Sequence, residues 1–177
     1  MTESVQRIAH LEAESRELVL PRFERSDAWE LGSGLAVRGL QSALPIAIDI
    51  RTTGGVLFHA SLPGATHDND DWIRRKAAAA LRFETSTALL QARAAGGGPD
   101  WFVEGWLDPR EYALAGGSVP VFVRGVGVVA AVTVSGLASD GDHTLVVEAL
   151  RGLLLGPRVI GTTGTPAQAP TPAGRHS

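Results

Sequence analysis

Apolar residues recur at helical spacing in the first part of the chain. Between residues 3 and 20 they fall close to one stripe of a helix: Val5, Ile8, Leu11 and Leu18. This pattern predicts an amphipathic helix, which Pro21 ends. Ser26 or Asp27 then offers an N-cap for a second helix that runs to about residue 43.

Strand patterns come in two pairs. Residues 45–51 alternate strictly between isoleucine and smaller or charged side chains, and residues 56–62 follow after a Thr-Gly-Gly turn, which predicts a β-hairpin. Residues 119–124 predict a third strand. Residues 126–135 are apolar on both parities, which is typical of a central strand covered on both faces.

Two further helices complete the pattern. Residues 69–94 predict one long helix, and residues 100–117 predict an irregular segment. Asp140 or Asp142 offers an N-cap for a last helix that ends near residue 155. The order predicts an α+β fold, a three-layer α/β/α sandwich in which an antiparallel sheet carries helices on both faces. A helix, a loop or a partner subunit must cover its edges.

The length indicates a single domain with a tail. A chain of 177 residues suffices for one well-buried domain, which we place at residues 1–158. Residues 159–177 are rich in Pro, Thr and Gly, and they contain too little apolar surface to fold. We therefore expect a disordered tail.

Composition excludes several functions. The formal net charge of −3 gives no broad electrostatic footprint for nucleic acid, and the absence of cysteine excludes disulfides and thiol catalysis. No basic segment followed by an apolar run opens the chain, and the longest apolar run is too short to span a bilayer. We expect a cytoplasmic protein without a nucleic-acid or membrane partner.

The segment around the start of the third helix carries the densest polar chemistry. His67, Asp68 and Asn69 precede two more aspartates, and together they offer oxygen and nitrogen ligands for a divalent cation. Capping is the simpler interpretation, with Asp68 as N-cap and acidic residues at the positive end of the helix dipole. Adjacent helical residues also project in different directions, so we expect no metal. An acid–base site at this junction remains a further alternative.

Two arginines of the same helix are candidates for anion binding. Arg75 and Arg82 are seven residues apart and share a helix face, whereas the consecutive cations at 74–76 cannot converge on one ligand. Asp71 lies one turn before Arg75, in the orientation that favours an ion pair. A salt-bridge face and a phosphate or carboxylate site are both compatible with this pattern.

His59 lies inside an otherwise apolar strand. A hairpin loop with an odd number of residues would place Asp49 across from it, and the pair could orient an imidazole for a ligand or for proton transfer. An even loop would place Ile48 there instead. A buried histidine with satisfied hydrogen bonds is the alternative to a functional one.

Two more candidates lie in the C-terminal half. His143 follows Asp140 and Asp142 closely enough for a carboxylate–imidazole dyad, although capping of the last helix by either aspartate also explains the segment. Gly116 and Gly117 could form a nest of backbone N–H groups for an anion, or a tight turn. No established catalytic motif such as Gly-x-Ser-x-Gly or His-Glu-x-x-His occurs.

Several motifs resemble one family. They are Leu-Pro-Gly-Ala-Thr-His-Asp-Asn-Asp-Asp-Trp-Ile-Arg-Arg-Lys at 62–76 and the segments 82–83, 112–117 and 133–147. Together they resemble an uncharacterised bacterial and fungal group of the HbpS-like family, which is related to GlcG and often labelled a haem-degrading domain. The resemblance extends over residues 18–154. It implies a profilin-like sandwich, a homo-oligomer and binding of haem or a similar planar ligand.

One position departs from the family pattern. Members usually carry His-Gly-Gly where this chain has Ala115 before its two glycines, so the resemblance supplies no catalytic residue. The remaining candidates for an axial haem ligand are three histidines and one tyrosine: His59, His67, His143 and Tyr112.

Two functions follow as hypotheses. The first is a homo-oligomeric module that binds a small ligand, with haem as a candidate cofactor. The second is a non-catalytic structural or adaptor oligomer that binds another protein. The family label implies haem degradation, but without a catalytic motif the sequence leaves enzymatic activity open.

Overall fold

The computed structural model describes residues 3–98 and 102–156, so the predicted tail lies outside the described residues. The helices are α1 (Glu3–Glu17), α2 (Arg25–Gln41), α3 (His67–Phe83), α4 (Thr87–Ala95) and α5 (Ser139–Leu155). The strands are β1 (Val19–Leu20), β2 (Ala47–Thr52), β3 (Gly55–Ser61), β4 (Ser118–Val123) and β5 (Gly127–Ser135).

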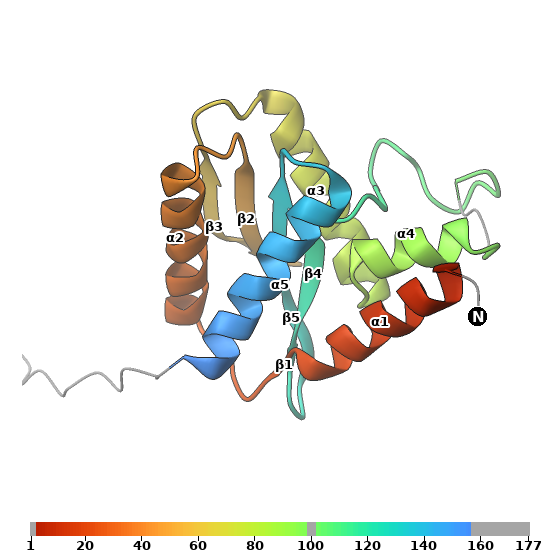
Figure 1. The fold of residues 1–177 in the computed structure, drawn as a ribbon, viewed down its shortest axis with the longest axis horizontal. Coiled ribbons are helices and arrows are strands. Elements are labelled where there is room, and N and C mark those ends of the chain that lie inside the picture. Colours follow the sequence, from red (N-terminus) through yellow and green to blue (C-terminus); the bar gives the residue numbers. More distant parts are fainter. Residues whose placement is uncertain (1–2, 99–101, 157–177) are drawn as a thin grey trace, which may run out of the picture.

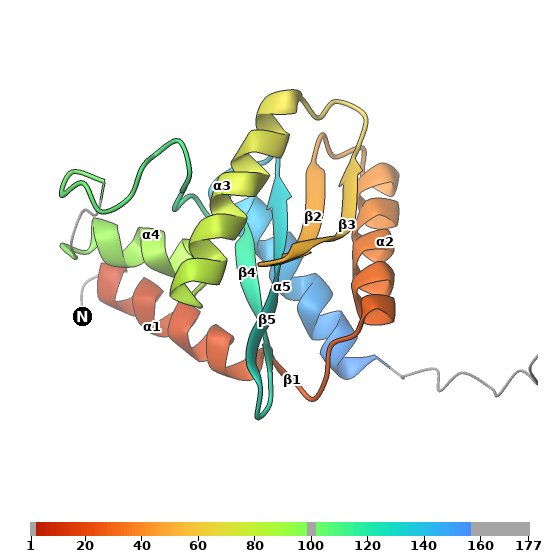
Figure 2. The same ribbon diagram turned by 180° about the vertical axis from the view of Figure 1, so that it is seen from behind.

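The strands form one sheet in the order β1-β4-β5-β2-β3. Figure 1 shows α2 and α5 on one face of this sheet, and Figure 2, from behind, shows α3 on the other. Helices α1 and α4 pack against each other beside the β4 side of the sheet. The predicted α+β fold with helices on both faces is confirmed, and β5 is the central strand.

The face under α2 and α5 contains the main apolar core. Ile48 and Ile50 of β2 and Val132 and Val134 of β5 are fully buried there. Each such side chain contributes about 1.5–3 kcal/mol through its removal from water. On the opposite face the apolar contact with α3 centres on Ala77, Ala80 and Ala131, which let the helix approach the sheet closely.

The predicted helix at 69–94 is wrong as a single element. It is divided into α3 and α4 at Glu84, which adopts a left-handed conformation with φ of 49°. Ser86 then caps α4, because its hydroxyl accepts a hydrogen bond from the Leu89 N–H at 3.3 Å. The break turns α4 away from the sheet so that it packs on α1.

Two predicted boundaries also differ. The first helix ends at Glu17 rather than near residue 20, because Val19 and Leu20 pair with β4 as a short parallel strand. Neither Ser26 nor Asp27 is the N-cap of α2. Glu24 holds that position, and its N–H donates to the Asp27 carboxylate at 2.7 Å in a capping box.

Candidate functional site

A polar pocket of about 320 Å³ lies where the N-terminal ends of α3 and α5 meet the end of β5. Its lining includes Asp68, Asn69, Trp72 and Lys76 of α3, Ala115, Ser135 of β5, the turn after β5 and Asp142 of α5. Elements that are far apart in the sequence therefore build one site. Of the residues predicted as ligand-binding, Asp68 and Asn69 line this pocket.

Lys76 and Asp142 form a buried ion pair in the pocket wall. The Lys76 ammonium donates to Asp142 Oδ2 at 2.9 Å and to the Val134 carbonyl oxygen at 3.2 Å. Lys76 is 3% exposed and Asp142 is 1% exposed. The second carboxylate oxygen of Asp142 accepts a hydrogen bond from the Leu137 N–H at 2.9 Å, so the turn before α5 holds the carboxylate in place.

Burial dominates the electrostatics of this pair. It lowers the pKa of Lys76, although the Asp142 carboxylate opposes the change. Burial also raises the pKa of Asp142. The charge of Lys76 and the hydrogen bonds from the backbone of Leu137 and Gly136 oppose this rise but do not outweigh it. Both pKa shifts favour the neutral forms of the two groups.

Gly117 leaves the space that the Lys76 side chain occupies. A Cβ atom at this position would lie 2.9 Å from Lys76 Nζ and 2.5 Å from the Val134 carbonyl oxygen. Its φ of +122° also disfavours other residues. Gly116 is close to α5, because a Cβ there would lie 2.7 Å from the Ser139 carbonyl oxygen. Neither glycine lines the pocket, but both permit close packing of the residues that do.

Ser135 and the start of α5 provide polar groups without partners from the described chain. Ser135 is 4% exposed and lines the pocket, and no hydrogen bond joins its hydroxyl to another described residue. Ala138 is the N-cap of α5 and supplies no side-chain oxygen. The predicted capping of this helix by Asp140 or Asp142 is therefore wrong. No described side chain caps the first N–H groups of α5, which lie beside Ser135 at the pocket.

Asp68 and Asn69 occupy the rim of the pocket. Asp68 is not the predicted N-cap of α3, since Thr66 holds that position and its N–H donates to Asn69 Oδ1 at 2.8 Å. Asp68 instead accepts a hydrogen bond from the Trp72 indole N–H at 3.0 Å. His67 is the exposed first residue of α3, and no hydrogen bond joins its imidazole to another described residue.

His59 lies in a separate polar cluster on the β3 side of the sheet. Asp49 is its direct cross-strand partner, and His59 Nδ1 lies 3.3 Å from Asp49 Oδ2. His59 Nε2 lies 3.3 Å from Asp70 Oδ1. Asp49 is fully buried and accepts two hydrogen bonds from Arg51, at 2.5 and 2.8 Å.

A β-bulge decides this register. The Thr53-Gly54 loop has an even number of residues, which alone would pair Ile48 with His59. The register of the two strands shifts between Ile50 and Arg51, where β3 contains one extra residue. This bulge places Asp49, rather than Ile48, across from His59. Both imidazole nitrogens are close to carboxylates, and His59 does not line the pocket.

His143 is buried between α5 and α1. Its Nε2 lies 2.7 Å from Glu14 Oε1, and its Nδ1 is buried without a partner among the described residues. The predicted dyad is wrong, because Asp140 forms an ion pair with Arg7 and Asp142 forms one with Lys76. Burial opposes ionisation of Glu14, but the hydrogen bond from His143 and nearby positive charges outweigh it and lower the pKa of Glu14.

Comparisons with known proteins place this fold in a family. The model described as "Haem degrading protein HbpS-like" matches residues 23–151. The chain belongs to the HbpS-like family. Its relatives include the UPF0303 protein SCO2848 of Streptomyces coelicolor, 49% identical over 81% of this chain and 90% of the relative, and a UPF0303 protein of Streptomyces avermitilis, 44% identical over 89% and 98%.

Solved structures share the fold of this HbpS-like protein. The structure described as Ybr137w protein matches with a TM-score of 0.72 and 32% identity over 81% of this chain and 84% of that one. A structure described as a PduOC–heme complex has a TM-score of 0.64 and 19% identity over 73% and 93%. HbpS itself has a TM-score of 0.61 and 20% identity over 77% and 92%.

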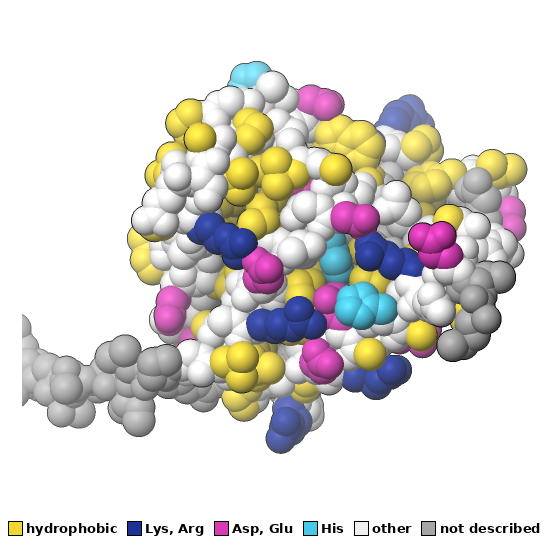
Figure 3. Space-filling view, viewed as in Figure 1, with side chains coloured by type: hydrophobic (Ala, Val, Ile, Leu, Met, Phe, Trp, Pro, Cys, Tyr) yellow, Lys and Arg dark blue, Asp and Glu magenta, His cyan; other side chains and the backbone are white. Residues whose placement is uncertain are grey.

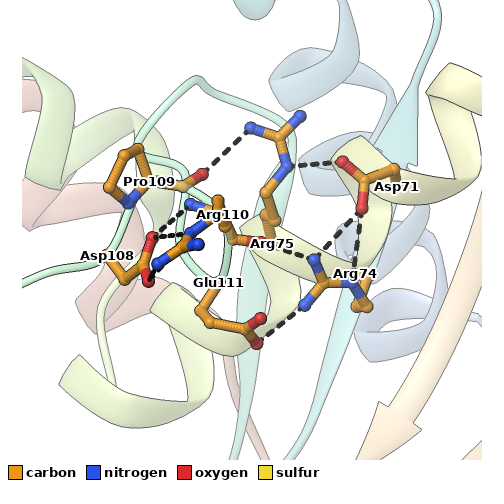
Figure 4. Close-up of polar contacts among 7 residues, drawn as sticks. All are labelled: Asp71, Arg74, Arg75, Asp108, Pro109, Arg110 and Glu111. Atoms are coloured by element: carbon orange, nitrogen blue, oxygen red, sulfur yellow. Dashed lines mark hydrogen bonds and ion pairs between the residues drawn. The ribbon is translucent and has the colours of Figure 1, made fainter.

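The arginines of α3 hold a loop rather than line the pocket. Figure 4 shows Arg74 between Asp71 and Glu111, at 3.1 and 2.9 Å. Arg75 donates to Asp71 at 2.8 Å, the ion pair that the spacing predicts, and to the Pro109 carbonyl oxygen at 3.4 Å. These contacts fasten the segment after α4 to the outer side of α3.

Arg82 likewise lies outside the pocket. Its guanidinium is 5.0 Å from the centre of the Tyr112 ring, a cation–π contact. Arg75 makes a similar contact with Trp72 at 4.3 Å. Arg75 and Arg82 are thus engaged with aromatic rings and do not converge on one anion.

In residues 3–98 and 102–156, no three His, Asp or Glu side chains come together as a set of metal ligands. Within the same residues, no helix combines the length and the apolar character needed to cross a bilayer.

The central residues of the pocket give little sign of their role in the sequence. Lys76 is the only lysine of the chain and precedes four alanines, and this isolation is the one local signal it gives. The spacing predicts Asp142 as a cap or as a dyad partner of His143, and Ser135 as part of a strand. Their proximity depends on contacts between residues up to 66 positions apart.

Proposed function

We propose that this HbpS-like protein is a homo-oligomeric module that binds a small polar ligand in the pocket between α3 and α5. The observation that carries the proposal is the convergence in one pocket of the Ser135 hydroxyl, the Lys76 ammonium and the start of α5, which can all donate hydrogen bonds. The Ser135 hydroxyl forms no hydrogen bond with another described residue, so it is available to a ligand in the pocket.

The chemistry of the walls limits the ligand. At about 320 Å³ the pocket lies near the lower end of ligand sites, which span roughly 300–1,000 Å³. Ser135, Lys76 and the start of α5 offer hydrogen-bond donors, whereas Asp68 at the rim offers a carboxylate. These groups favour a compact ligand with several oxygen atoms.

Amide chemical shifts test this proposal directly. The full-length ¹⁵N-labelled protein would be mixed with a library of small carboxylic acids, aldehydes, polyols and amides. We expect shifts that cluster at the N–H groups of Gly136, Leu137 and Ser139. Ala115→Phe should fill the pocket and abolish them, whereas Ala95→Phe, the same change at an exposed position on α4, should preserve them. A library that leaves these amides unmoved would contradict the proposal.

Haem is a second candidate ligand. It is supported by the family description and by the likeness to a structure described as a PduOC–heme complex. The polar pocket does not fit a porphyrin, because its walls are polar and none of its lining residues is a histidine or tyrosine. Of the three predicted histidine ligands, only His67 is exposed without a described hydrogen-bond partner, so a haem would bind outside the pocket.

A hemin titration separates this candidate from the first. Binding through His67 should produce a Soret shift that is lost in His67→Ala and retained in His59→Ala and His143→Ala. Ala115→Phe should not alter the shift, because it fills only the polar pocket. A Soret shift that persists in all three histidine variants would exclude these histidines as haem ligands, and the absence of any shift would remove haem as a ligand.

The homo-oligomer is supported by exposed apolar side chains. Figure 3 shows apolar side chains gathered on and beside α2. Four large apolar residues of α2 and β3 are more than half exposed: Trp29, Val37, Leu40 and Val56. Strand β3 is also an edge of the sheet, with backbone groups open to another strand. An oligomer, or the adaptor role that remains the alternative function, would cover these groups.

Light scattering tests the assembly. We expect a mass of at least two chains at micromolar concentration, and a lower mass for Trp29→Ser combined with Leu40→Ser. A monomer at that concentration would contradict the proposed assembly without affecting the pocket.

A further inference from the structure

We infer that Lys76 is a reactive amine, which condenses with the carbonyl group of a small polar aldehyde or ketone bound in the pocket. The inference rests on the proposed function, since it concerns the same pocket. It adds the chemical class of the substrate and a covalent step.

The position of Lys76 suits such a reaction. Its side chain comes from the middle of α3, and its Nζ reaches the pocket wall through the space left by Gly117. Two of its three hydrogen-bonding positions are occupied, by Asp142 and by the Val134 carbonyl oxygen. No described residue occupies the third, which is available to a group in the pocket. No other lysine exists in the chain.

An amine must be neutral to attack a carbonyl carbon. Desolvation activates lysine in this way, and the burial of Lys76 lowers its pKa accordingly. Asp142 lies 2.9 Å from the amine and has a raised pKa, so it is placed to take up and return a proton. Both properties follow from one feature, the removal of the pair from water.

The reaction balances with these two residues and the carbonyl compound. The Nζ lone pair attacks the carbonyl carbon, and the electron pair of the C–O π bond moves to oxygen, which takes up the proton of the neutral Asp142 carboxyl group. The resulting Asp142 carboxylate removes a proton from the nitrogen, which leaves a carbinolamine. Asp142 then gives this proton to the departing hydroxyl group, water leaves, and the C=N bond of a protonated imine forms beside the Asp142 carboxylate. No electron donor or acceptor is required.

The rest of the pocket would hold the substrate. Ser135 and the uncapped N–H groups of α5 lie on the pocket wall and can bind oxygen atoms next to the carbonyl carbon. Asp68 at the rim disfavours a further negative charge. An uncharged hydroxy-aldehyde or hydroxy-ketone matches these groups best.

A purely structural ion pair is the competing explanation. Such a pair would tie α3 to α5 with its amine charged and unreactive. Buried ion pairs stabilise proteins no better than apolar residues of the same volume, so the fold alone does not require one here. The two explanations differ in the reactivity of a single amine.

Reductive trapping distinguishes them. The full-length protein would be incubated with glycolaldehyde and sodium cyanoborohydride at neutral pH, followed by intact-mass measurement and peptide mapping. Besides the N-terminal amine, Lys76 is the only amine that can react, so the assignment is direct. We expect an adduct on Lys76 that forms at least about tenfold faster than on Nα-acetyl-lysine amide.

Three variants sharpen the result. Ala115→Phe should suppress the adduct, and Ala95→Phe should leave its rate unchanged. Asp142→Asn keeps an oxygen for the Leu137 N–H and should slow the adduct by at least about tenfold while circular dichroism shows a folded protein. A Lys76 adduct that is absent, or that forms no faster than on the free amino acid derivative, would overturn the inference.

The outcome for the proposed function is read separately. Glycolaldehyde without reductant, followed by amide chemical shifts, reports whether the pocket is occupied. Shifts in the pocket without a Lys76 adduct would retain the binding function and overturn the reactive lysine. If the whole library leaves the pocket amides unmoved and no adduct forms, both fail.

Discussion

The two faces of the sheet differ in the side chains that they bury. Under α2 and α5 the sheet presents large aliphatic residues such as Ile48, Ile50 and Val132, all fully buried. Under α3 it presents alanines together with Asp49, Thr133 and other polar residues, which are also fully buried. One face is thus an apolar core, whereas the other contains polar groups that require partners.

This difference supports the proposed site. Buried polar groups contribute less to stability than aliphatic ones of the same volume, so stability alone does not account for a polar face. On the α3 face the polar groups reach the surface at the pocket that contains Lys76 and Ser135. The apolar face supplies the stability that permits this arrangement.

The largest effect is expected from Lys76→Met. It leaves the Asp142 carboxylate buried without its cation, which should lower the free energy of unfolding by about 3–5 kcal/mol. Urea denaturation followed by circular dichroism measures the loss. Adding Asp142→Asn should restore most of it, because the unpaired charge is then removed. If Lys76→Met alone were as stable as the variant that combines it with Asp142→Asn, the ion pair would not be buried as described.

Ile50→Ala tests the apolar face. The side chain is fully buried, and its truncation should cost about 2–5 kcal/mol, through lost burial and the cavity that remains. The amide shifts caused by pocket ligands should persist under conditions where the variant is folded. Loss of ligand shifts in a folded Ile50→Ala protein would break the division between the two faces.

Glu14 tests a buried polar pair away from the pocket. Its pKa in the folded protein is lowered from the ordinary 4.5, so its charged form stabilises the fold above that pH and the stabilisation is lost as the pH falls below it. Glu14→Gln should cost about 1.5–3 kcal/mol at neutral pH, the range of hydrogen bonds to charged groups, and progressively less in acid. Denaturation at several pH values measures this. A cost that stays constant into acid would contradict the lowered pKa.

Arg74→Ala should have the smallest effect. Its ion pairs with Asp71 and Glu111 are largely exposed, and such pairs contribute about 0–1 kcal/mol. Thermal denaturation should show a change within that range, and pocket ligands should bind as before. A cost above about 2 kcal/mol would show that the loop held by Arg74 belongs to the core.

Local patterns predicted most of the fold. Strict alternation in β2 and apolar residues on both parities of β5 identify the strands, because a strand's two faces follow directly from sequence parity. The break between α3 and α4 could not be predicted, because the helical pattern of apolar residues continues across it. Glu84 and Ser86 interrupt the helix only through backbone conformation and capping.

The site could be predicted only in part. Asp68 and Asn69 stand out as a polar cluster, and both line the pocket. The pairing of Lys76 with Asp142 depends on how α3 and α5 cross the end of β5, which no local pattern encodes. His59 shows the same limit, because a single bulge decided which residue lies across from it.

Capture of small molecules tests the central claim most directly. The wild-type protein, Ala115→Phe and Ala95→Phe would each be incubated with a cell extract of small molecules, washed, denatured and examined by mass spectrometry. The polar pocket predicts at least one compact, oxygen-rich compound that is retained by the wild type and Ala95→Phe and lost from Ala115→Phe. Identical profiles for all three proteins would contradict a ligand site between α3 and α5.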